Sequence, residues 1–416
     1  MELGARSLGF LFALALIARL AAVGVAGFST VRFGDARAYL SAAGELAHEG
    51  RYPISTEPFY FRAPGYPFFL AVATLGRPES VPRAKVATAL VGSFAAPLLA
   101  LLSARIFRRR AVALATGVAA ALHPAFLWNS ADVQSEPLFT TLLLAAGFFL
   151  LVSTDRPSST LALGAGVVLA LAALTRSSAL ALAPLLVAPL LDRRYPFRAR
   201  AHIAGAALLG FALALLPWTA RNAMVFGELV PVNDAAGNVF YQGNSDWQVR
   251  FFELRSRDEY LRWVEAMHRD LARQTEALRV AGRTSPSERS RYFVSRAIAE
   301  RSADPTGWVR LLLRKSWEWL KPYPTTWFWP RSVVVGVGAC NVALFALAVA
   351  GFVSAPRPGV RAFALAVLAI SMAAHVLLLV VWRFRVPYWD PVLLLYGVFG
   401  AGTLLTGWKL STSPGP

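Results

Sequence analysis

The feature that most constrains the fold is a series of apolar runs that recurs along nearly the whole chain. The first run, 8–28, is long enough to cross a hydrocarbon core of roughly 30 Å at about 1.5 Å per helical residue. Runs of similar character follow at 86–107, 111–128, 138–152, 161–174, 180–191, 203–218, 333–353, 362–382 and 391–408. Because the membrane core offers no partner for free backbone groups, this pattern predicts an all-α integral membrane protein with about ten transmembrane helices.

Composition and charge exclude several other classes of protein. Of the 416 residues, 56% are hydrophobic and only 16% are charged, which is too apolar for an ordinary soluble domain. The net charge of +18 does not indicate nucleic acid, because the basic residues lie in short loops between apolar runs. The only cysteine, Cys340, lies in an apolar run, which excludes an intrachain disulfide and a cysteine metal site. Arg19 interrupts the first run, so we expect a retained helix and not a cleaved signal peptide.

The basic loops predict the orientation of the chain. The loops 105–110, 193–200 and 357–361 are rich in arginine and fall on one side, which the positive-inside rule makes cytoplasmic. The opposite side then holds the loop 29–85 and the long segment 219–331. We therefore expect an N-terminal transmembrane module over 1–218 that includes this outer loop, an outer helical domain over 219–331, and C-terminal transmembrane helices over 332–416.

The outer segments also contain signals for helices. Residues 36–49 have the spacing of an amphipathic surface helix, with Asp35 as its N-cap and Gly50 at its end. Residues 64–75 are too few to cross the membrane and predict a helix at its outer interface. In the outer domain, a helical period covers 258–282, a capping box occurs at Ser285-Pro-Ser-Glu288, and Asp304-Pro305 opens a further helix.

Strongly polar residues collect at the ends of apolar runs on the predicted outer side. Ionisable groups are costly at membrane depth, so this clustering indicates function. Each residue also has a structural explanation, because a carboxylate can cap a helix or face its N-terminus and an arginine can anchor at the interface. His123 and His375 have no metal-spaced partner, which favours packing over metal binding. The candidates are Asp35, Arg37, Tyr39, Arg62, Glu136, Arg176, Arg221, Asn244, Arg383 and Arg385.

The order of several motifs resembles a known family. The motifs are Asp35-x-x-x-Tyr39, Gly50-Arg-Tyr-Pro, Arg62-Ala-Pro-Gly-Tyr-Pro67, Ser135-Glu136-Pro-Leu-Phe139, Pro217-Trp-Thr-Ala-Arg-Asn222, Gly243-Asn244 and Arg383-Phe-Arg-Val-Pro387. Their order is similar to that of the GT-C superfamily of membrane glycosyltransferases, in particular family 39 proteins related to protein mannosyltransferases and to the aminoarabinose transferase that modifies lipid A. The likeness covers most of the chain and is strongest in 1–245. Many members have an acidic Asp-Glu pair in the first outer loop, whereas Ala36 follows Asp35 here.

The resemblance implies a GT-C type helix bundle and an inverting glycosyltransferase that moves a hexose or pentose. The donor would be a sugar on a polyprenyl phosphate, and the acceptor a hydroxyl on a lipid, polysaccharide or protein at the periplasmic face of the bacterial inner membrane. Asp35 is then the candidate base and Glu136 the second carboxylate. The donor phosphate would meet Arg37, Tyr39, Arg62, Arg383 and Arg385, and the acceptor or the loops would be positioned by Arg176, Arg221 and Asn244. Whether a divalent cation takes part stays open.

Two other functions fit the same composition. A lipid or sugar transporter would place charges near the middle of the membrane and show two similar halves, whereas the charges here lie at span ends and no half-repeat is apparent. The second alternative is an assembly protein with the same fold and a catalytically inactive site, and the missing acidic residue after Asp35 is compatible with it.

Overall fold

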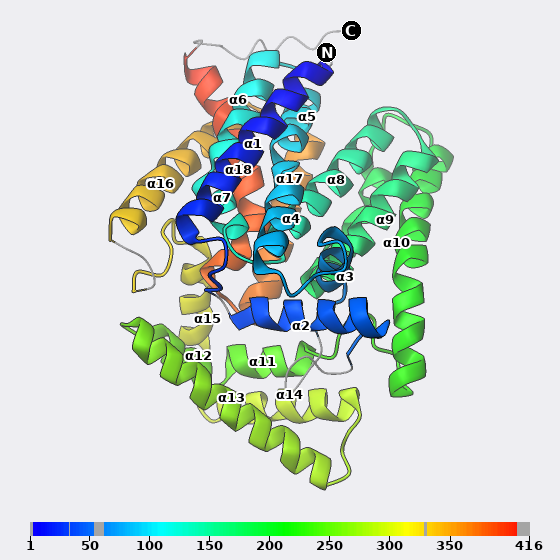
Figure 1. Cartoon of the computed structure of the whole chain (residues 1–416). Coiled ribbons are helices and arrows are strands. Elements are labelled where there is room, and N and C mark those ends of the chain that lie inside the picture. Colours follow the sequence, from blue (N-terminus) through cyan, green and yellow to red (C-terminus); the bar gives the residue numbers. More distant parts are fainter. Residues whose placement is uncertain (1–2, 33, 54–61, 328–330, 406–416) are drawn as a thin grey trace.

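The structure is a computed structural model that describes residues 3–32, 34–53, 62–327 and 331–405. Its regular elements in these residues are all helices, which confirms the predicted all-α fold (Figure 1). The helices form a long bundle with a group of polar helices at one end. The first helix, α1, begins and the last helix, α18, ends at the other end of the bundle (Figure 1).

The apolar runs form the bundle, and the protein is a multi-pass membrane protein. The break between α6 (Arg110–Leu122) and α7 (Pro124–Ser130) bends the pair by 46°, and together they make a further candidate span. Six stretches are by themselves long and apolar enough to cross a membrane: α1 (Ala5–Ala26), α4 with α5 (Val81–Phe107), α8 (Glu136–Asp155), α10 (Phe197–Phe226), α16 (Arg331–Ser354) and α17 (Pro358–Leu377).

Three further apolar runs are shorter or irregular. They form α9 (Ser159–Thr175), η1 (Ser177–Leu191) and α18 (Val386–Leu405). η1 is a 3-10 helix, because Pro184 and Pro189 lie inside it and cannot donate the backbone bonds of an α-helix. Each of the ten predicted runs thus contains helix, and residues 406–408 of the last run lie outside the described residues.

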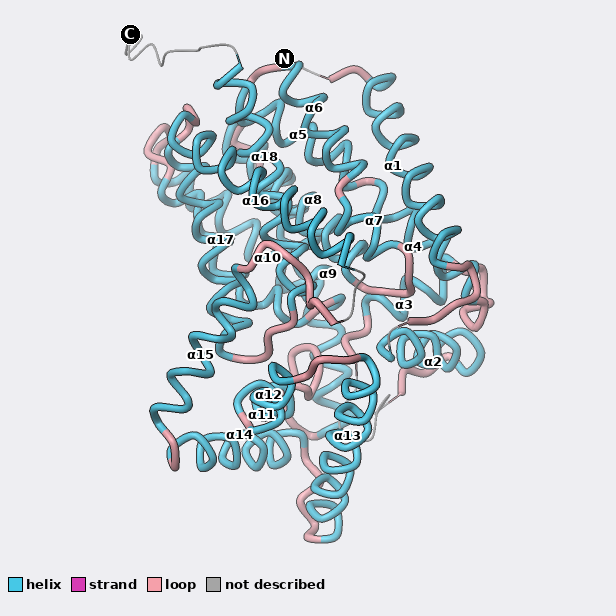
Figure 2. Tube along the Cα trace, turned by 90° about the vertical axis from the view of Figure 1, so that its left-hand side faces the viewer, coloured by secondary structure: helices cyan, strands magenta, loops and turns pink. Residues whose placement is uncertain are grey.

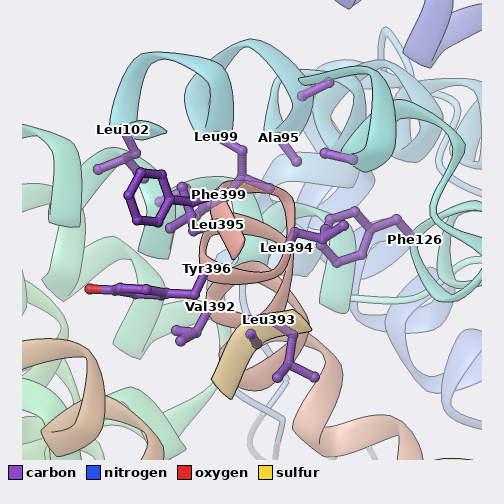
Figure 3. Close-up of a cluster of buried hydrophobic side chains, with 14 of the residues drawn as sticks. Ala95, Leu99, Leu102, Phe126, Val392, Leu393, Leu394, Leu395, Tyr396 and Phe399 are labelled. Carbon is purple, nitrogen blue, oxygen red and sulfur yellow. The ribbon is translucent and has the colours of Figure 1, made fainter. Parts of the chain in front are cut away.

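α18 forms the core of the bundle (Figure 3). Its Phe399 stacks on Phe107 of α5 with 4.1 Å between ring centroids, and Tyr396 stacks on Phe352 of α16 at 3.8 Å. Beside this contact the two backbones nearly touch, since a Cβ on Gly351 would lie 1.9 Å from the carbonyl oxygen of Tyr396. Small residues therefore let α16 and α18 pack closely, as they do in other membrane helix pairs.

The three arginine-rich loops meet at the end of the bundle where α1 begins and α18 ends. Arg357 pairs with Asp155 at the end of α8 and also donates to the carbonyl oxygen of Arg105 at 3.3 Å. Arg194 Nη2 lies 3.6 Å from the same carboxylate. The three loops therefore share one end of the bundle, as predicted from the sequence.

The opposite end carries the polar helices (Figures 1 and 2). The capping box at Ser285 is present and starts α14, and Asp304 caps α15 through the backbone N–H of Gly307, both as predicted. The helices at this end are α2 (Gly34–Glu49), α3 (Gly65–Ala73), α11 (Ala236–Asn244), α12 (Asp246–Glu253), α13 (Arg257–Val280), α14 (Pro286–Ser302) and α15 (Pro305–Leu320).

Two boundaries differ from the expected ones. α2 begins at Gly34, so Asp35 lies in its first turn and the predicted N-cap role is wrong. In that turn the carboxylate still faces the positive end of the helix dipole. α10 continues through Pro217 to Phe226, beyond the boundary expected at 218, because Pro217 interrupts its backbone bonding without ending the helix.

Candidate active site

Five charged residues from five parts of the chain meet at the polar end of the bundle. Asp35 comes from the first turn of α2 and Glu136 is the first residue of α8. Arg176 follows the last residue of α9, and Arg383 lies in η2 (Trp382–Arg385), a short 3-10 helix before α18. Arg62 precedes α3. These side chains lie close together because they come from helix ends and adjoining loops, and charged residues of apolar helices lie at the helix ends.

The five side chains form a continuous chain of ion pairs. Arg62 Nη2 lies 3.0 Å from Asp35 Oδ1, and Arg383 pairs with the other oxygen of the same carboxylate. Arg383 Nε also lies 3.6 Å from Glu136 Oε1, and Arg176 Nη1 lies 3.0 Å from that oxygen. We call these residues, Asp35, Arg62, Glu136, Arg176 and Arg383, the ion-pair cluster. Arg383 is its centre, because it joins the two carboxylates.

The ion-pair cluster is rich in guanidinium groups. Three of them face two carboxylates within the cluster. The side chains of Asp35 and Arg383 are 26% and 19% exposed, whereas that of Glu136 is 1% exposed. An anion can therefore reach Asp35 and the arginines from solvent, while Glu136 forms the floor.

The arginines decide the charge state of Asp35. Burial alone would raise the pKa of its carboxyl group, but the charges of Arg62 and Arg383 outweigh burial and hold this pKa well below its usual range. In the free protein Asp35 is therefore ionised at any physiological pH. A ligand that draws the arginines away would raise the pKa of Asp35, because burial would then act with less compensation.

Neutral groups fix the geometry around the charges. Gln134 Oε1 accepts a hydrogen bond from Arg383 at 2.8 Å, and Ser135 Oγ accepts one from Arg176 at 3.1 Å. Tyr39, one turn after Asp35, places its hydroxyl 3.2 Å from Ser135 Oγ and its ring beneath the Arg62 guanidinium at 5.6 Å. The segment before α8 thus orients two arginines at once.

Arg221 and Asn244 act on the surroundings and do not touch the charges. Arg221 donates to the carbonyl oxygen of Tyr52 at 3.0 Å, and the Tyr52 hydroxyl donates to the carbonyl oxygen of Arg62. Arg221 therefore supports the loop that carries Arg62. Asn244 donates to the carbonyl oxygen of Leu377 at 2.8 Å, which ties the outer domain to the end of α17.

Arg37 and Arg385, both expected at the donor phosphate, form no ion pair with the ion-pair cluster among the described residues, and that role stays a prediction. Arg37 is exposed, because it stands two residues after Asp35 and so points to a different side of α2. Arg385 is buried and donates to the carbonyl oxygens of Trp319, Leu320 and Lys321, which end α15. Its Nε also lies 3.8 Å from Asp390. Arg385 therefore caps the C-terminal end of α15.

Three residues beside the ion-pair cluster were not predicted from the sequence. Gln134 and Ser135 directly precede Glu136, and their place before the Glu-Pro start of α8 was the available signal. Tyr260 comes from α13, far along the chain. Burial raises the pKa of its phenol, and the charges of Arg383 and Asp35 also act on it. No local motif marks this tyrosine, since its position depends on how the outer domain docks.

The described residues contain no group of three or more His, Cys, Asp or Glu side chains that could hold a metal ion. Both carboxylates of the ion-pair cluster are instead paired with arginine.

The sequence matches no family model and no curated protein. Solved structures do share its fold. The archaeal oligosaccharyltransferase AglB from Archaeoglobus fulgidus, in complex with an inhibitory peptide and a dolichol-phosphate, is 15% identical over 96% of this chain and 50% of its own, with a TM-score of 0.56. The same protein in complex with Zn and sulfate gives 15% identity over 95% and 49%, with a TM-score of 0.57. This chain thus spans about half the length of AglB.

A third structure, ArnT from Cupriavidus metallidurans bound to undecaprenyl phosphate, is 16% identical over 97% of this chain and 79% of its own, with a TM-score of 0.44. Because the identity with AglB is only 15%, this likeness shows a shared fold alone. That fold is the GT-C fold which the order of motifs predicted.

Proposed function

We propose that the protein is an inverting glycosyltransferase that moves a sugar from a polyprenyl-phosphate donor to an acceptor hydroxyl at the periplasmic face of a bacterial inner membrane. The observation that carries the proposal is the ion-pair cluster: a partly exposed carboxylate held between partly exposed arginines, at the end of an apolar bundle. The lipid chain of such a donor stays in the bilayer, and its phosphate and sugar lie at this level.

The arginines provide the site for the donor phosphate. Guanidinium groups bind phosphate through two parallel hydrogen bonds, and Arg62 and Arg383 both have partly exposed side chains. Their positive charge attracts the phosphate as it binds. During transfer the phosphate gains charge as the bond to the sugar breaks, so the same arginines stabilise the leaving group more in the transition state than in the bound donor.

Asp35 serves as the base. As the phosphate draws Arg62 and Arg383 toward itself, the Asp35 carboxylate loses stabilisation and becomes a stronger proton acceptor. The acceptor oxygen then bonds to the anomeric carbon while the carbon–phosphate oxygen bond breaks, and the acceptor proton passes to Asp35. The leaving phosphate takes the electron pair. One direct displacement of this kind inverts the configuration at the sugar.

Glu136 positions the arginines. It is buried, and it holds Arg176 and Arg383 from below, so both guanidinium groups keep their orientation when Asp35 releases its partners. The acidic residue absent after Asp35 in sequence is thereby replaced in space by a carboxylate from α8. The presence of a second carboxylate favours a catalytically active site over an inactive one. The location of the charges at the polar end of the bundle argues against a transporter, which needs charges near the membrane midplane.

Transfer of label from a polyprenyl-phosphate sugar tests the proposal. The purified protein in lipid nanodiscs is incubated with a panel of radiolabelled undecaprenyl-phosphate hexoses and pentoses and with an extract of the host's glycolipids and polysaccharides. We expect the label to move from the donor to an acceptor. In this product the labelled sugar has the anomeric configuration opposite to that in the donor. Retained configuration would exclude direct displacement. Movement of the intact donor across liposomes without any product would favour the transporter.

A further inference from the structure

The helices α11, α12, α13 and α14 lie together at the polar end of the bundle (Figure 2). Residues of these four helices line an open pocket of about 460 Å³. This volume lies within the range of small-ligand sites, roughly 300 to 1,000 Å³. The pocket does not touch the ion-pair cluster, and none of its residues took part in the proposed reaction. Its polar and aromatic lining includes Tyr241, Trp247, Arg250, Arg269, Arg273 and Arg296.

The arginines at this pocket are more available than its carboxylates. Asp270 already accepts hydrogen bonds from the Trp247 indole at 3.1 Å and from Gln274 at 2.7 Å, and it pairs with Arg273. In contrast, Arg250 is exposed and forms no ion pair with any described residue. Arg269 is 73% exposed, and its partner Glu265 is 3.9 Å away. The rim therefore offers guanidinium groups to an anion from solvent.

Aromatic rings hold two of the rim arginines. The Arg250 guanidinium lies over the Trp247 ring at 5.5 Å, and that of Arg296 lies over the Tyr241 ring at 5.8 Å. Arg296 also lies 3.6 Å from Glu300 Oε1 through its Nε and donates to the Tyr292 hydroxyl, so of these two arginines Arg250 is the one that can turn its N–H edges to a ligand. A stacked guanidinium loses less conformational freedom when it binds a carboxylate or phosphate.

A row of aromatic rings leads from the pocket to the ion-pair cluster. Trp247 contacts Trp263 edge to face with 6.3 Å between ring centroids, and Trp263 stacks on Tyr260 at 6.1 Å. Tyr260 in turn lies where the charges of Arg383 and Asp35 act on it. The aromatic residues of α12 and α13 thus extend from the pocket to Tyr260, on which the charges of the ion-pair cluster act.

We propose that this pocket binds an acidic saccharide, a sugar unit with a carboxylate or phosphate group that belongs to the acceptor and lies away from the reacting hydroxyl. The identity of this saccharide as acceptor rests on the proposed function, whereas its binding does not. The exposed arginines Arg250 and Arg269 receive the acidic group.

Binding to the full-length protein in nanodiscs tests the inference directly. Isothermal titration compares three probes of similar length: trigalacturonic acid, which is acidic; maltotriose, which is neutral; and triglutamate, an acidic peptide. We expect trigalacturonic acid to bind more tightly than the other two, with an affinity that falls as salt is added. Absence of trigalacturonic acid binding, or equal binding of triglutamate, would overturn the proposal.

Variants connect the binding to the pocket. The double variant Arg250→Ala/Arg269→Ala should weaken the binding of trigalacturonic acid by on the order of tenfold or more, because it removes two charge-assisted contacts. The matched control is Arg279→Ala, since Arg279 is also an exposed arginine on α13 but lies outside the pocket. Equal loss in the control would mean that net charge, and not the pocket, determines binding.

Asp35→Asn separates this inference from the proposed function. We expect the variant to bind trigalacturonic acid as the wild type does. If trigalacturonic acid binds in the pocket but no donor supports transfer, the proposed function fails and the binding site remains. If transfer occurs but Arg250→Ala/Arg269→Ala uses every acceptor at the wild-type KM, the pocket is not an acceptor site.

Discussion

Arg383 is the residue whose loss should disturb the ion-pair cluster most. Among the described side chains it alone pairs with both Asp35 and Glu136, and it also donates to Gln134 at 2.8 Å. We expect Arg383→Ala to lower kcat/KM for the polyprenyl-phosphate donor by roughly 10- to 100-fold. A hydrogen bond to a charged group contributes about 1.5–3 kcal/mol, and each 1.4 kcal/mol corresponds to about a factor of ten. The side chain is partly exposed, so solvent screens any larger effect.

The same substitution should change how stability depends on pH. In the wild type the pKa of Asp35 is depressed, so its ion pairs stabilise the fold above the unfolded-state pKa, near 3.9, and this contribution is lost as pH falls through the lower folded-state value. Without Arg383 the folded-state pKa rises toward the ordinary value. The variant should therefore lose part of this stabilisation at neutral pH, and its acid unfolding should begin at higher pH than that of the wild type.

Donor kinetics and thermal unfolding are measured on the same nanodisc preparations. Arg383→Lys should recover only part of the rate, because it keeps the charge but cannot contact three acceptors in a plane. The matched control is Arg37→Ala, which removes an exposed arginine of α2 and should lower kcat/KM less. Wild-type kcat/KM in Arg383→Ala would show that the donor phosphate does not bind at the ion-pair cluster, and the reasoning above would be refuted.

Two further predictions concern the bundle. Gly351→Ala should clearly lower the thermal unfolding temperature, since the new Cβ would lie 1.9 Å from the Tyr396 carbonyl oxygen. In the control Gly147→Ala the new Cβ has no atom within 4 Å, so this variant should be as stable as the wild type or more stable. Equal unfolding temperatures for the two variants would contradict the close packing of α16 and α18. The orientation is tested with single-cysteine variants on a Cys340→Ser background and a membrane-impermeant maleimide. The reagent should label Ser295→Cys on α14 in intact cells, and Arg156→Cys beside Asp155 only after the membrane is permeabilised. The reverse labelling pattern would mean the opposite orientation.

The helices and the residues of the ion-pair cluster could be predicted from the sequence. Apolar runs and capping signals depend on neighbouring residues, so the span of α8 and the start of α14 follow from local pattern. All five residues of the ion-pair cluster were found for a related reason. Each lies near the end of an apolar run or in the loop 29–85, on the one predicted side of the membrane where such ends share the same depth.

Side-chain direction could not be predicted in the same way. Arg383 and Arg385 are two residues apart in η2, yet one faces Asp35 and the other faces the carbonyl oxygens that end α15. The choice depends on where α15 ends in space, which no local pattern gives. The positions of Tyr260 and of the pocket in the outer domain likewise follow from the packing of helices that are distant in the chain.

Asp35→Asn tests the central claim most directly. Asn has nearly the same size as Asp and still accepts a hydrogen bond from an arginine through its amide oxygen, but it cannot take the acceptor's proton. Transfer is measured as a single turnover with saturating donor, and donor binding is measured separately on the same sample. Glu136→Gln is the companion variant and should lose less, because Glu136 only positions the arginines.

We predict that Asp35→Asn folds, binds the donor and transfers sugar roughly 10² to 10⁴ times more slowly than the wild type. Transfer at a rate near that of the wild type would contradict the assignment of Asp35 as the base.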